Sequence, residues 1–508
     1  AGVAEVWLRA PEERLVWRAR GIASSPTLIA GPHALYVAWH HNVREDTGVA
    51  DIAKWITLRC VRGGEVFEPA APMTGRDRDL AGEEQSFEFP ELVLGGDGAI
   101  AIFGRGSHNF WRQDLSAAGF SERAPLSDGN WGSRGRRCAA ALLNDDSLVC
   151  ARRDRRAIVV TTHAAPTGGA PAWIRATVDH VDPRPSLERD AREDPAAKLG
   201  LEARFGDIQQ HSAHSDGIGS ADEAYLRARD HYGDDFVALT DHESFLGKRT
   251  GPGEWEYLKA VADRFDAPGN FATMLAYEWT GKMYPGPGHK CVYVPQRDSP
   301  LISRDEVPSG RDFVALAKEH GMLASPHHIG WTGCDEDGHD PVAQPTWEIC
   351  SCHGCYEHAD HPLGQRGEHT HQLVDAMLAK GHRFGFTASS DSHGLLWHHG
   401  ESRKRDPYRT GLTAVQVPTL TRDAVFDALR TRRCYATSGA KILLDLSVDG
   451  QPMGSELSGR GGLVKASVRG TTTLRRVELV GLGGVVFAAE LSPKSGAADF
   501  EFNVESER

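Results

Sequence analysis

Five short polar strings between residues 207 and 394 carry the residue types of metal and acid–base chemistry. They read Asp207-Ile-Gln-Gln-His-Ser-Ala-His-Ser-Asp-Gly217, Thr240-Asp-His242, Tyr277-Glu-Trp-Thr-Gly281 with Gly288-His289 just beyond, Pro326-His-His328, and Ser389-Ser-Asp-Ser-His-Gly394. Carboxylate oxygens mixed with imidazole nitrogens suit Zn²⁺, Mn²⁺ or Fe²⁺. A carboxylate such as Glu278 could bridge two ions about 3.5–4 Å apart that activate a shared hydroxide. One string alone would be weak evidence, but five in order indicate a metal centre.

Histidine is concentrated in the same part of the chain. Of the 24 histidines, 18 lie between Gly206 and Gly400. Several of them neighbour acidic residues in short Gly-rich strings. Such clusters are typical of metal or acid–base sites.

The strings need a scaffold that brings their ends together. Between residues 201 and 440, apolar segments such as Phe236–Thr240, Met274–Tyr277 and Phe384–Ala388 alternate with segments of helical character. This alternation predicts a mainly parallel sheet or a barrel, in which active residues follow the C-terminal ends of strands. The expected helices are Ala221–His231, Glu254–Phe265, Arg311–His320, His371–Lys380 and Arg422–Thr431.

β structure is expected on both sides of this region. Two similar segments, Ser24–Gly31 and Glu88–Gly95, open units in the N-terminal part. Their spacing of roughly 45–65 residues suits propeller-like blades, and a sandwich is the alternative. The Pro-rich, charged residues 181–200 are typical of a linker. We therefore expect a multidomain chain of α/β and all-β parts: a β-rich domain at 1–190, a central domain at 200–440, and a small β-sandwich at 441–508.

Composition narrows the function classes. The net charge of −13 argues against a nucleic-acid partner bound through a broad basic surface. The longest apolar run near the C-terminus, Leu479–Ala489, is too short to cross a bilayer, which takes about 20 residues, so no membrane span is expected. Nine cysteines, an odd number, favour reduced thiols over a disulfide framework. A cytoplasmic location is favoured over a periplasmic or secreted one.

The five strings resemble the PHP superfamily, named for its polymerase and histidinol phosphatase members. The strings Glu-Trp-Thr-Gly, Gly-His-Lys, Trp-Glu-Ile…His-Gly…Glu and Tyr-Ala-Thr-Ser-Gly-Ala-Lys-Ile resemble more narrowly its DUF3604 branch. The resemblance covers about residues 200–460. It implies a distorted seven-stranded (β/α)7 barrel, two or three divalent metal ions (Zn, Mn or Fe) and hydrolysis of phosphate esters.

The resemblance also implies a set of metal-site residues. Asp216 and His242 are expected on one ion, Asp391 and His211 on another, and Glu278 as the bridge. In the family's first motif, Gln209 stands where a histidine is usual. An amide oxygen binds transition metals more weakly than imidazole, so one ion is expected to be labile or to be a harder metal such as Mn²⁺ or Mg²⁺. The full implied set is Gln209, His211, Asp216, His242, Glu278, His289, His327, Asp391 and His393.

Other residues are candidates for proton transfer or substrate contact. They are His214, His328, His353 and Glu357. Three of the cysteines in Glu348–Glu357, together with Cys334, could instead bind a zinc ion, although their spacing is not the usual paired one. Lys290, Arg366 and Arg383 are the basic residues considered for holding a phosphate.

The sequence thus predicts a metal-dependent hydrolase in which a metal-bound hydroxide attacks a phosphate ester. The expected partner is a small, anionic ester substrate. Two alternatives stay open: hydrolysis of carboxylic esters, lactones or amides at the same site, and a glycan- or partner-binding protein whose barrel is weakly active.

Overall fold

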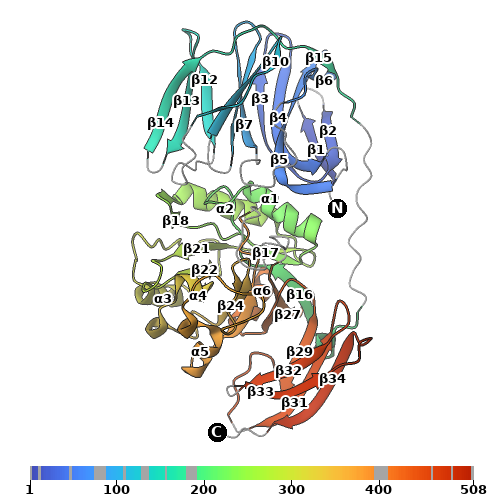
Figure 1. Ribbon diagram of the computed structural model, residues 1–508, viewed down its shortest axis with the longest axis vertical. Helices are drawn as coiled ribbons and strands as arrows, with labels where there is room; N and C mark the ends of the chain where they lie inside the picture. Colours follow the sequence, from blue (N-terminus) through green and yellow to red (C-terminus); the bar gives the residue numbers. More distant parts are fainter. Residues whose placement is uncertain are drawn as a thin grey trace.

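The computed structural model describes residues 3–9, 13–44, 49–73, 87–106, 110–126, 137–154, 157–178, 192–393, 410–458, 461–481 and 484–504. Figure 1 shows three parts along the longest axis: N-terminal sheets at one end, a central part that holds the helices, and C-terminal strands at the other end. The chain is built mainly of β-sheets with few helices. Part of the predicted linker, residues 181–191, lies outside the described residues, and its end forms a 3₁₀ turn at Pro195–Leu199.

The N-terminal part consists of antiparallel sheets. Its strands are β1 (Val3–Leu8), β2 (Arg14–Arg20), β3 (Ala23–Ala30), β4 (Leu35–Arg44), β5 (Val49–Arg62), β6 (Glu65–Pro69), β7 (Glu88–Leu94), β8 (Ile100–Arg105), β9 (Phe110–Ser116), β10 (Gly119–Phe120), β11 (Ala124–Pro125), β12 (Cys138–Leu142), β13 (Ser147–Asp154), β14 (Ala157–Ala164) and β15 (Trp173–Arg175). The sheet orders are β1-β2, β15-β6-β5-β4-β3, β10-β9-β8-β7 with β11 on β9, and β12-β13-β14. Side chains such as Ile56, Ile102 and Trp111 form one of its buried apolar clusters.

The central part combines four sheets, one of them the two-stranded β18-β19, with six helices among the described residues. Its elements are β16 (Glu202–Asp207), α1 (Ala221–Leu226) continued by a π-helical turn (Arg227–Tyr232), β17 (Phe236–Ala238), β18 (Ser244–Phe245), β19 (Lys248–Arg249), α2 (Pro252–Phe265), β20 (Ala272–Met274), β21 (Ala276–Thr280), β22 (His289–Tyr293), α3 (Gly310–Glu319), β23 (Leu323–Pro326), α4 (Ile329–Thr332), β24 (Thr346–Ser351), β25 (Gly354–Cys355), α5 (Val374–Ala379), β26 (Gly385–Ala388), β27 (Leu412–Val417), α6 (Arg422–Arg430) and β28 (Cys434–Thr437). The five predicted helices are all present, with ends that shift by a few residues.

The predicted seven-stranded (β/α)7 barrel is not confirmed. The larger sheets of the central part are β20-β17-β16-β27-β28, β21-β22-β23 and β25-β24-β26. Parallel pairing joins β16, β17 and β20, and also β24 and β26, but β21, β22 and β23 are antiparallel. Only residues 281–288 connect β21 to β22, whereas a parallel crossover needs a dozen residues or more. The short connection therefore makes β22 run antiparallel to β21.

The C-terminal part is a small β structure. Its strands are β29 (Leu443–Val448), β30 (Gln451–Pro452), β31 (Gly462–Arg469), β32 (Arg476–Gly481), β33 (Gly484–Glu490) and β34 (Ala497–Val504). They form the sheets β30-β29-β31-β34 and β32-β33. The ring of Phe487 on β33 lies 4.1 Å from that of Phe502 and 5.3 Å from that of Phe500, both on β34, so the two sheets pack on each other. The domain boundaries given above stay a prediction.

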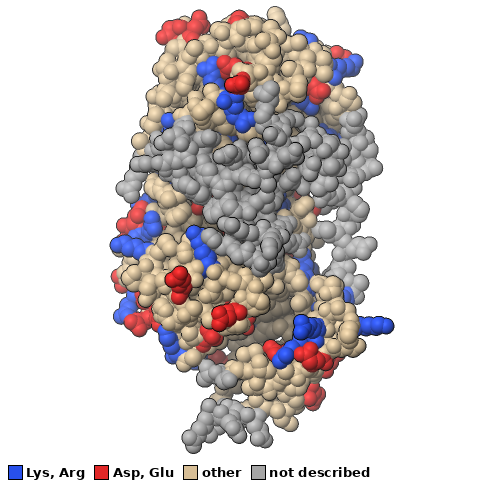
Figure 2. All heavy atoms as spheres, in the orientation of Figure 1, with Lys and Arg blue, Asp and Glu red and all other residues tan. Residues whose placement is uncertain are grey.

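The distribution of charge on the surface is consistent with the negative net charge of the sequence. On the face drawn in Figure 2, basic and acidic side chains are interspersed over the described part, without a broad basic area. Among the residues that the structure describes, no helix combines the length and apolar character needed to cross a membrane.

Candidate metal centre

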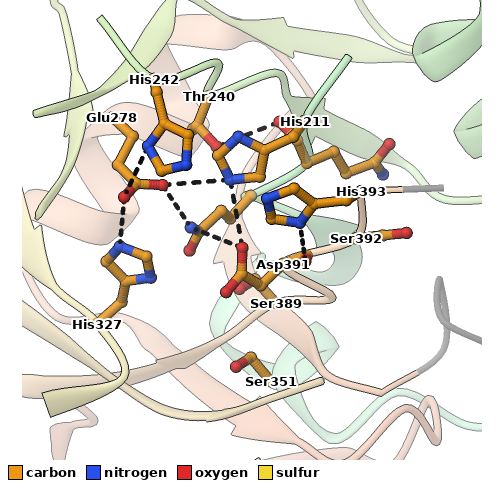
Figure 3. Close-up of polar contacts among 12 residues, drawn as sticks. His211, Thr240, His242, Glu278, His327, Ser351, Ser389, Asp391, Ser392 and His393 are labelled. Atoms are coloured by element: carbon orange, nitrogen blue, oxygen red, sulfur yellow. Dashed lines mark hydrogen bonds and ion pairs between the residues drawn. The ribbon is translucent and has the colours of Figure 1, made fainter. Parts of the chain in front are cut away.

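The first and last polar strings lie side by side where strands β16 and β26 end. Asp391 N donates to Gln209 O at 3.0 Å, and His211 N donates to Ser392 O at 2.8 Å. Bridge pairing between His242 and Glu278 joins the second string to the third in the same way. Backbone hydrogen bonds therefore bring residues that are far apart in sequence into one site (Figure 3).

Glu278, on β21, lies at the centre of this site and is 0% exposed. Its Oε1 lies 2.7 Å from His289 Nδ1, 3.1 Å from His242 Nδ1 and 3.2 Å from His327 Nε2. Its Oε2 lies 3.2 Å from His211 Nε2. Figure 3 shows three of these imidazoles converging on the carboxylate. One carboxylate thus contacts histidines from four of the five strings, as a bridging ligand would.

Three overlapping groups of side chains surround Glu278, and within each group the ligand-type atoms lie within 4.8 Å of one another. The groups are His211–Glu278–Asp391, His211–Asp216–His242–His393, and Glu278–His289–His327–His328. His393 Nε2 lies 3.2 Å from Asp216 Oδ1. Gln209 reaches the same place, with Nε2 at 3.1 Å from both Glu278 Oε2 and Asp391 Oδ1. All nine residues predicted for the metal site are therefore brought together, in the predicted pairs.

The side chains of this centre fit divalent metal ions. Several buried polar atoms of the centre face one another at 2.7–3.2 Å without the geometry of a hydrogen bond. Among the described residues, these unsatisfied atoms include Glu278 Oε1, His289 Nδ1, His211 Nε2, Gln209 Oε1 and both ring nitrogens of His327. Leaving buried polar atoms unsatisfied costs about 1–3 kcal/mol each. Carboxylate and imidazole donors that point at one another across such gaps are the donor set of Zn²⁺, Mn²⁺ or Fe²⁺ sites.

Backbone geometry at the centre is strained at two non-glycine residues. Asp391 has φ 49° and His328 has φ 33°. Non-glycine residues in the left-handed region cost of order 1–3 kcal/mol and cluster at functional sites. Both residues lie in the site, so the strain is located where the side chains must converge.

A layer of residues that hold the candidate ligands was not predicted from the sequence. Asp241 accepts hydrogen bonds from the backbone and hydroxyl of both Ser212 and Ser215, at 2.6–3.1 Å. Thr280 Oγ1 lies 2.7 Å from His242 Nδ1, which leaves Nε2 toward Asp216. Asp241 stands inside the Thr-Asp-His string, so its position beside a ligand was the available signal. Such partners orient metal ligands and are typical of metal sites.

The four proton-transfer candidates separate into two pairs. His353 Nε2 lies 3.1 Å from Asp391 Oδ2, and His328 Nε2 lies 3.9 Å from the same atom. His214 instead pairs with Glu254 at 2.7 Å and belongs to none of the three groups. The side chain of Glu357 is 47% exposed and lies 3.8 Å from His361. The structure thus brings His328 and His353 beside Asp391, whereas His214 pairs with Glu254 and Glu357 lies in a separate group with Cys355 and His361.

The carboxylates of the centre have pKa values that are shifted in different directions. Burial alone would raise the pKa of Glu278, but the imidazoles of His242 and His327 lower it well below its usual range. Burial likewise opposes ionisation of Asp391, and His353 and His211 lower its pKa. For Glu348, burial and the neighbouring charge of Asp391 outweigh the effect of His327 and of the hydrogen bond from Ser389, and its pKa is raised to about 7. The first two carboxylates are therefore ionised at neutral pH, as metal ligands must be.

The zinc alternative for the cysteines is not formed. Among the described residues no group of ligand-type atoms contains Cys334, Cys350, Cys352 and Cys355 together. Cys350 Sγ donates to Thr410 O and Cys352 Sγ to Asp391 O. The string instead forms the end of β24, a turn and β25. Of its residues, His353 contacts the carboxylate of Asp391, and Cys352 contacts its backbone carbonyl.

The three basic candidates for phosphate binding differ in surroundings. Lys290 is buried, and its Nζ donates to Pro287 O at 2.7 Å; burial lowers its pKa to about 8. Arg383 pairs with Glu456 at 2.7 Å on the surface. The guanidinium of Arg366 lies 3.4 Å from the centroid of the Trp331 ring, whose other neighbours include His353.

Part of the central region matches a known family model. Residues 248–311 match the family model described as "Protein of unknown function (DUF3604)". The predicted resemblance to DUF3604 is thereby confirmed. The matched segment contains Glu278 and His289, two of the residues at the centre.

Three chlamydial proteins, all uncharacterized, are similar in sequence. A protein of Chlamydia pneumoniae is 26% identical over 273 residues, which cover 50% of this chain and 43% of that protein. A protein of Chlamydia trachomatis is 32% identical over 154 residues, 28% of this chain and 25% of that protein. The third, from Chlamydia muridarum, is 30% identical over 162 residues, 29% of this chain and 26% of that protein. The chain spans less than half the length of these relatives.

Two solved structures show a weaker likeness. A two-domain protein from Bacteroides vulgatus, described as containing a predicted PHP-like metal-dependent phosphoesterase, has 14% identity and a TM-score of 0.37, over 64% of this chain and 91% of that one. A protein of unknown function from Dyadobacter fermentans has 14% identity and a TM-score of 0.20, over 32% of this chain and 42% of that one. At these TM-scores neither structure is used to assign the fold or the function of this chain.

Proposed function

We propose that this chain is a metal-dependent hydrolase that cleaves phosphate esters at the centre around Glu278. The observation that carries the proposal is the position of Glu278, a buried carboxylate contacted by histidines of four separate strings. The order of those strings along the chain supports a PHP-like centre, in which two or three divalent ions share such a carboxylate.

The residues that would hold the ions follow from the three groups. Asp216, His242 and His393 would hold one ion, and His211 and Asp391 with Gln209 a second. Glu278 with His289 and His327 would hold a third. Divalent ions at such sites supply activation of water and neutralisation of negative charge on the reacting ester.

The protein's own residues supply proton transfer beside this centre. His353 is buried, and burial lowers the pKa of its imidazole, so the ring is neutral at neutral pH and can accept a proton. Its Nε2 faces Asp391, which ties it to the ligand cluster. His328 is held by Thr332 Oγ1 at 2.8 Å from Nδ1, which directs Nε2 toward Asp391. We assign these two histidines to moving the protons of the reacting water and the leaving group.

Arg366 supports an anionic substrate. It has no carboxylate within 4.0 Å among the residues that the structure describes, whereas Arg383 is already paired. Its backbone N donates to His353 O at 2.8 Å, which fixes its segment beside a residue in contact with Asp391. A guanidinium stacked on an indole keeps its in-plane donors available for the oxygens of a phosphate.

A substrate screen tests the proposal. The full chain is loaded with Mn²⁺ or Zn²⁺ and offered a nitrophenyl phosphate monoester, a phosphate diester, a nitrophenyl acetate and a lactone. Metal-dependent turnover of a phosphate ester is expected, lost in Glu278→Ala and kept in Glu319→Gln, which changes an exposed carboxylate of α3. Turnover of the carboxylic esters alone would favour the other electrophile class, and no turnover by metal-loaded protein would favour a binding role.

A further inference from the structure

The segment that follows the ligand Asp216 is held by side chains of the N-terminal part. Arg105, at the end of β8, donates from Nη2 to Gly217 O at 2.8 Å. Glu88, at the start of β7, accepts from Gly219 N at 2.6 Å. The hydroxyls of Ser24 and Ser220 lie 2.6 Å apart. Figure 1 shows α1, which begins directly after this segment, lying against the N-terminal sheets.

The groups that make these contacts are charged and almost fully buried. Arg105 is 1% exposed, Glu88 0% and Lys54 1%. Lys54 Nζ lies 3.5 Å from Glu88 Oε1 and 3.1 Å from Glu223 Oε1 on α1, and Arg105 Nη1 lies 3.9 Å from Glu88 Oε2. Burying ions costs several kcal/mol each even when they are paired, and apolar residues often serve stability as well or better. A network of this kind between two parts of a chain therefore points to a role besides cohesion.

The backbone that Arg105 holds connects several ligands directly. Gly217 follows Asp216, and a Cβ atom on Gly217 would lie 2.5 Å from His211 O, so these two segments are in close contact. The next amide, Ile218 N, donates to His393 O at 2.9 Å. A shift of the Gly217 peptide would displace Asp216, His211 and His393 together, which are members of one ligand group.

We propose that Arg105 is a positioning residue of the metal centre, so that the N-terminal β part completes the site in the central part. It acts through the Gly217 carbonyl and sets the position of Asp216. Glu88 holds the other end of the same loop through Gly219. This inference rests on the metal centre proposed above, but not on the identity of the substrate.

Metal titration of variants tests the proposal. Arg105→Gln removes the charged donor, Arg105→Lys keeps a donor for Gly217 O, and Arg112→Gln is the control. Arg112, on β9, also donates to a backbone carbonyl, Ala164 O, but within the N-terminal part. The measurements on each full chain are the Mn²⁺ affinity, the number of ions bound, and the melting temperature without metal.

Arg105→Gln is expected to weaken the binding of one ion on the order of tenfold or more, the effect typical of removing a residue that orients ligands. Arg105→Lys should recover part of this loss, and Arg112→Gln should bind like the parent. If Arg105→Gln does not fold, Glu88→Gln and Arg105→Lys carry the test, and both are expected to weaken the same ion.

Unchanged Mn²⁺ affinity in folded Arg105 variants, even with a lower melting temperature, would show that Arg105 only stabilises the interface and would overturn the proposal. A parent chain that binds no divalent ion would overturn the metal centre itself and this inference with it. The two failures are therefore distinguished by the behaviour of the parent.

Discussion

Gln209 Nε2 lies 3.1 Å from Glu278 Oε2 and donates to it, although Glu278 is the carboxylate expected to bridge metal ions. The same amide nitrogen donates to Asp391 Oδ1 at 3.1 Å, while Gln209 Oε1 is buried without a hydrogen-bond partner among the described residues. The amide thus turns its donor toward two carboxylates at a position where the resemblance to the PHP superfamily predicts a histidine ligand. Rotating the amide by half a turn would present Oε1 to the same point as a weak ligand.

Gln209→His is therefore predicted to tighten the ion shared by His211 and Asp391. Imidazole nitrogen is the stronger donor to transition metals, so retained metal should rise and the preference should shift toward Zn²⁺. Titration of parent and variant with Zn²⁺ and Mn²⁺, followed by a mild chelator, measures the change. Equal affinities for every ion would place Gln209 outside the coordination sphere.

Glu278→Ala is predicted to abolish activity with little change in fold. The substitution removes the carboxylate shared by four imidazoles, so it should cost several kcal/mol of transition-state stabilisation, roughly a 10³-fold loss in kcat. Circular dichroism checks the fold, and Glu319→Gln on the surface is the control. Activity within about tenfold of the parent, in a folded sample, would mean that Glu278 is not the bridge.

Asp241→Asn is predicted to weaken metal binding although Asp241 is not itself a predicted ligand. An amide in place of the carboxylate can accept only part of the hydrogen bonds from Ser212 and Ser215, so the loop between His211 and Asp216 should loosen. A loss of 10–100-fold in affinity is the usual order for such partners, so roughly tenfold is expected here. Asp266→Asn, which disturbs a carboxylate bound to Thr273 N away from the centre, should leave Mn²⁺ affinity unchanged.

The candidate ligands could be predicted from sequence because four of the five strings begin at or just after the end of a strand; Glu278 instead lies within β21, and His289 begins β22. The segments after β16 and β26 meet through a parallel bridge between Gln210 and Ser392, which brings His211 and Asp391 together although the two strands belong to different sheets. The antiparallel pairing of β21 with β22 was not predicted, because alternating elements suggested a crossover that the short connection of residues 281–288 does not allow. Glu357 lies near His353 in sequence, but its side chain lies beside His361, whereas His353 contacts Asp391.

Contacts between the N-terminal and central parts could not be predicted, because they leave no pattern in the local sequence. Arg105 stands 112 residues before Gly217, at the end of a strand whose sequence is ordinary for a buried sheet. Nothing near Arg105 or Glu88 indicates that their charges face a loop of another part. The role of such residues can be inferred only from the three-dimensional structure.

Arg366→Gln is predicted to raise KM for a phosphate ester about tenfold, with a smaller change in kcat. The reason is that a guanidinium without a carboxylate partner contributes binding to an anion at about 1.5–3 kcal/mol per charged hydrogen bond. A neutral ester should be unaffected, and Arg383→Gln should resemble the parent because Arg383 is paired with Glu456. An equal rise in KM for the neutral ester would show that Arg366 shapes the site without recognising charge.

Glu223→Gln is predicted to remove a pH-dependent part of the stability. Burial would raise the pKa of Glu223, but Lys54, His40 and Arg227 lower it far below its ordinary value of 4.5. A carboxylate with a depressed folded pKa stabilises the protein above its unfolded pKa, and this contribution is lost as the pH falls below about 4.5 toward the folded pKa. At pH 7 the variant should therefore melt at a lower temperature than the parent, because the buried cations Lys54 and Arg227 each lose one charged partner. The difference in melting temperature should narrow as the pH is lowered through 4.5, since only the parent has this stabilisation to lose.

Melting curves of parent, Glu223→Gln and the surface variant Glu319→Gln between pH 7 and 3.5 measure the difference. A gap that stays constant over this range would show that the charge of Glu223 contributes nothing to the interface between the N-terminal and central parts.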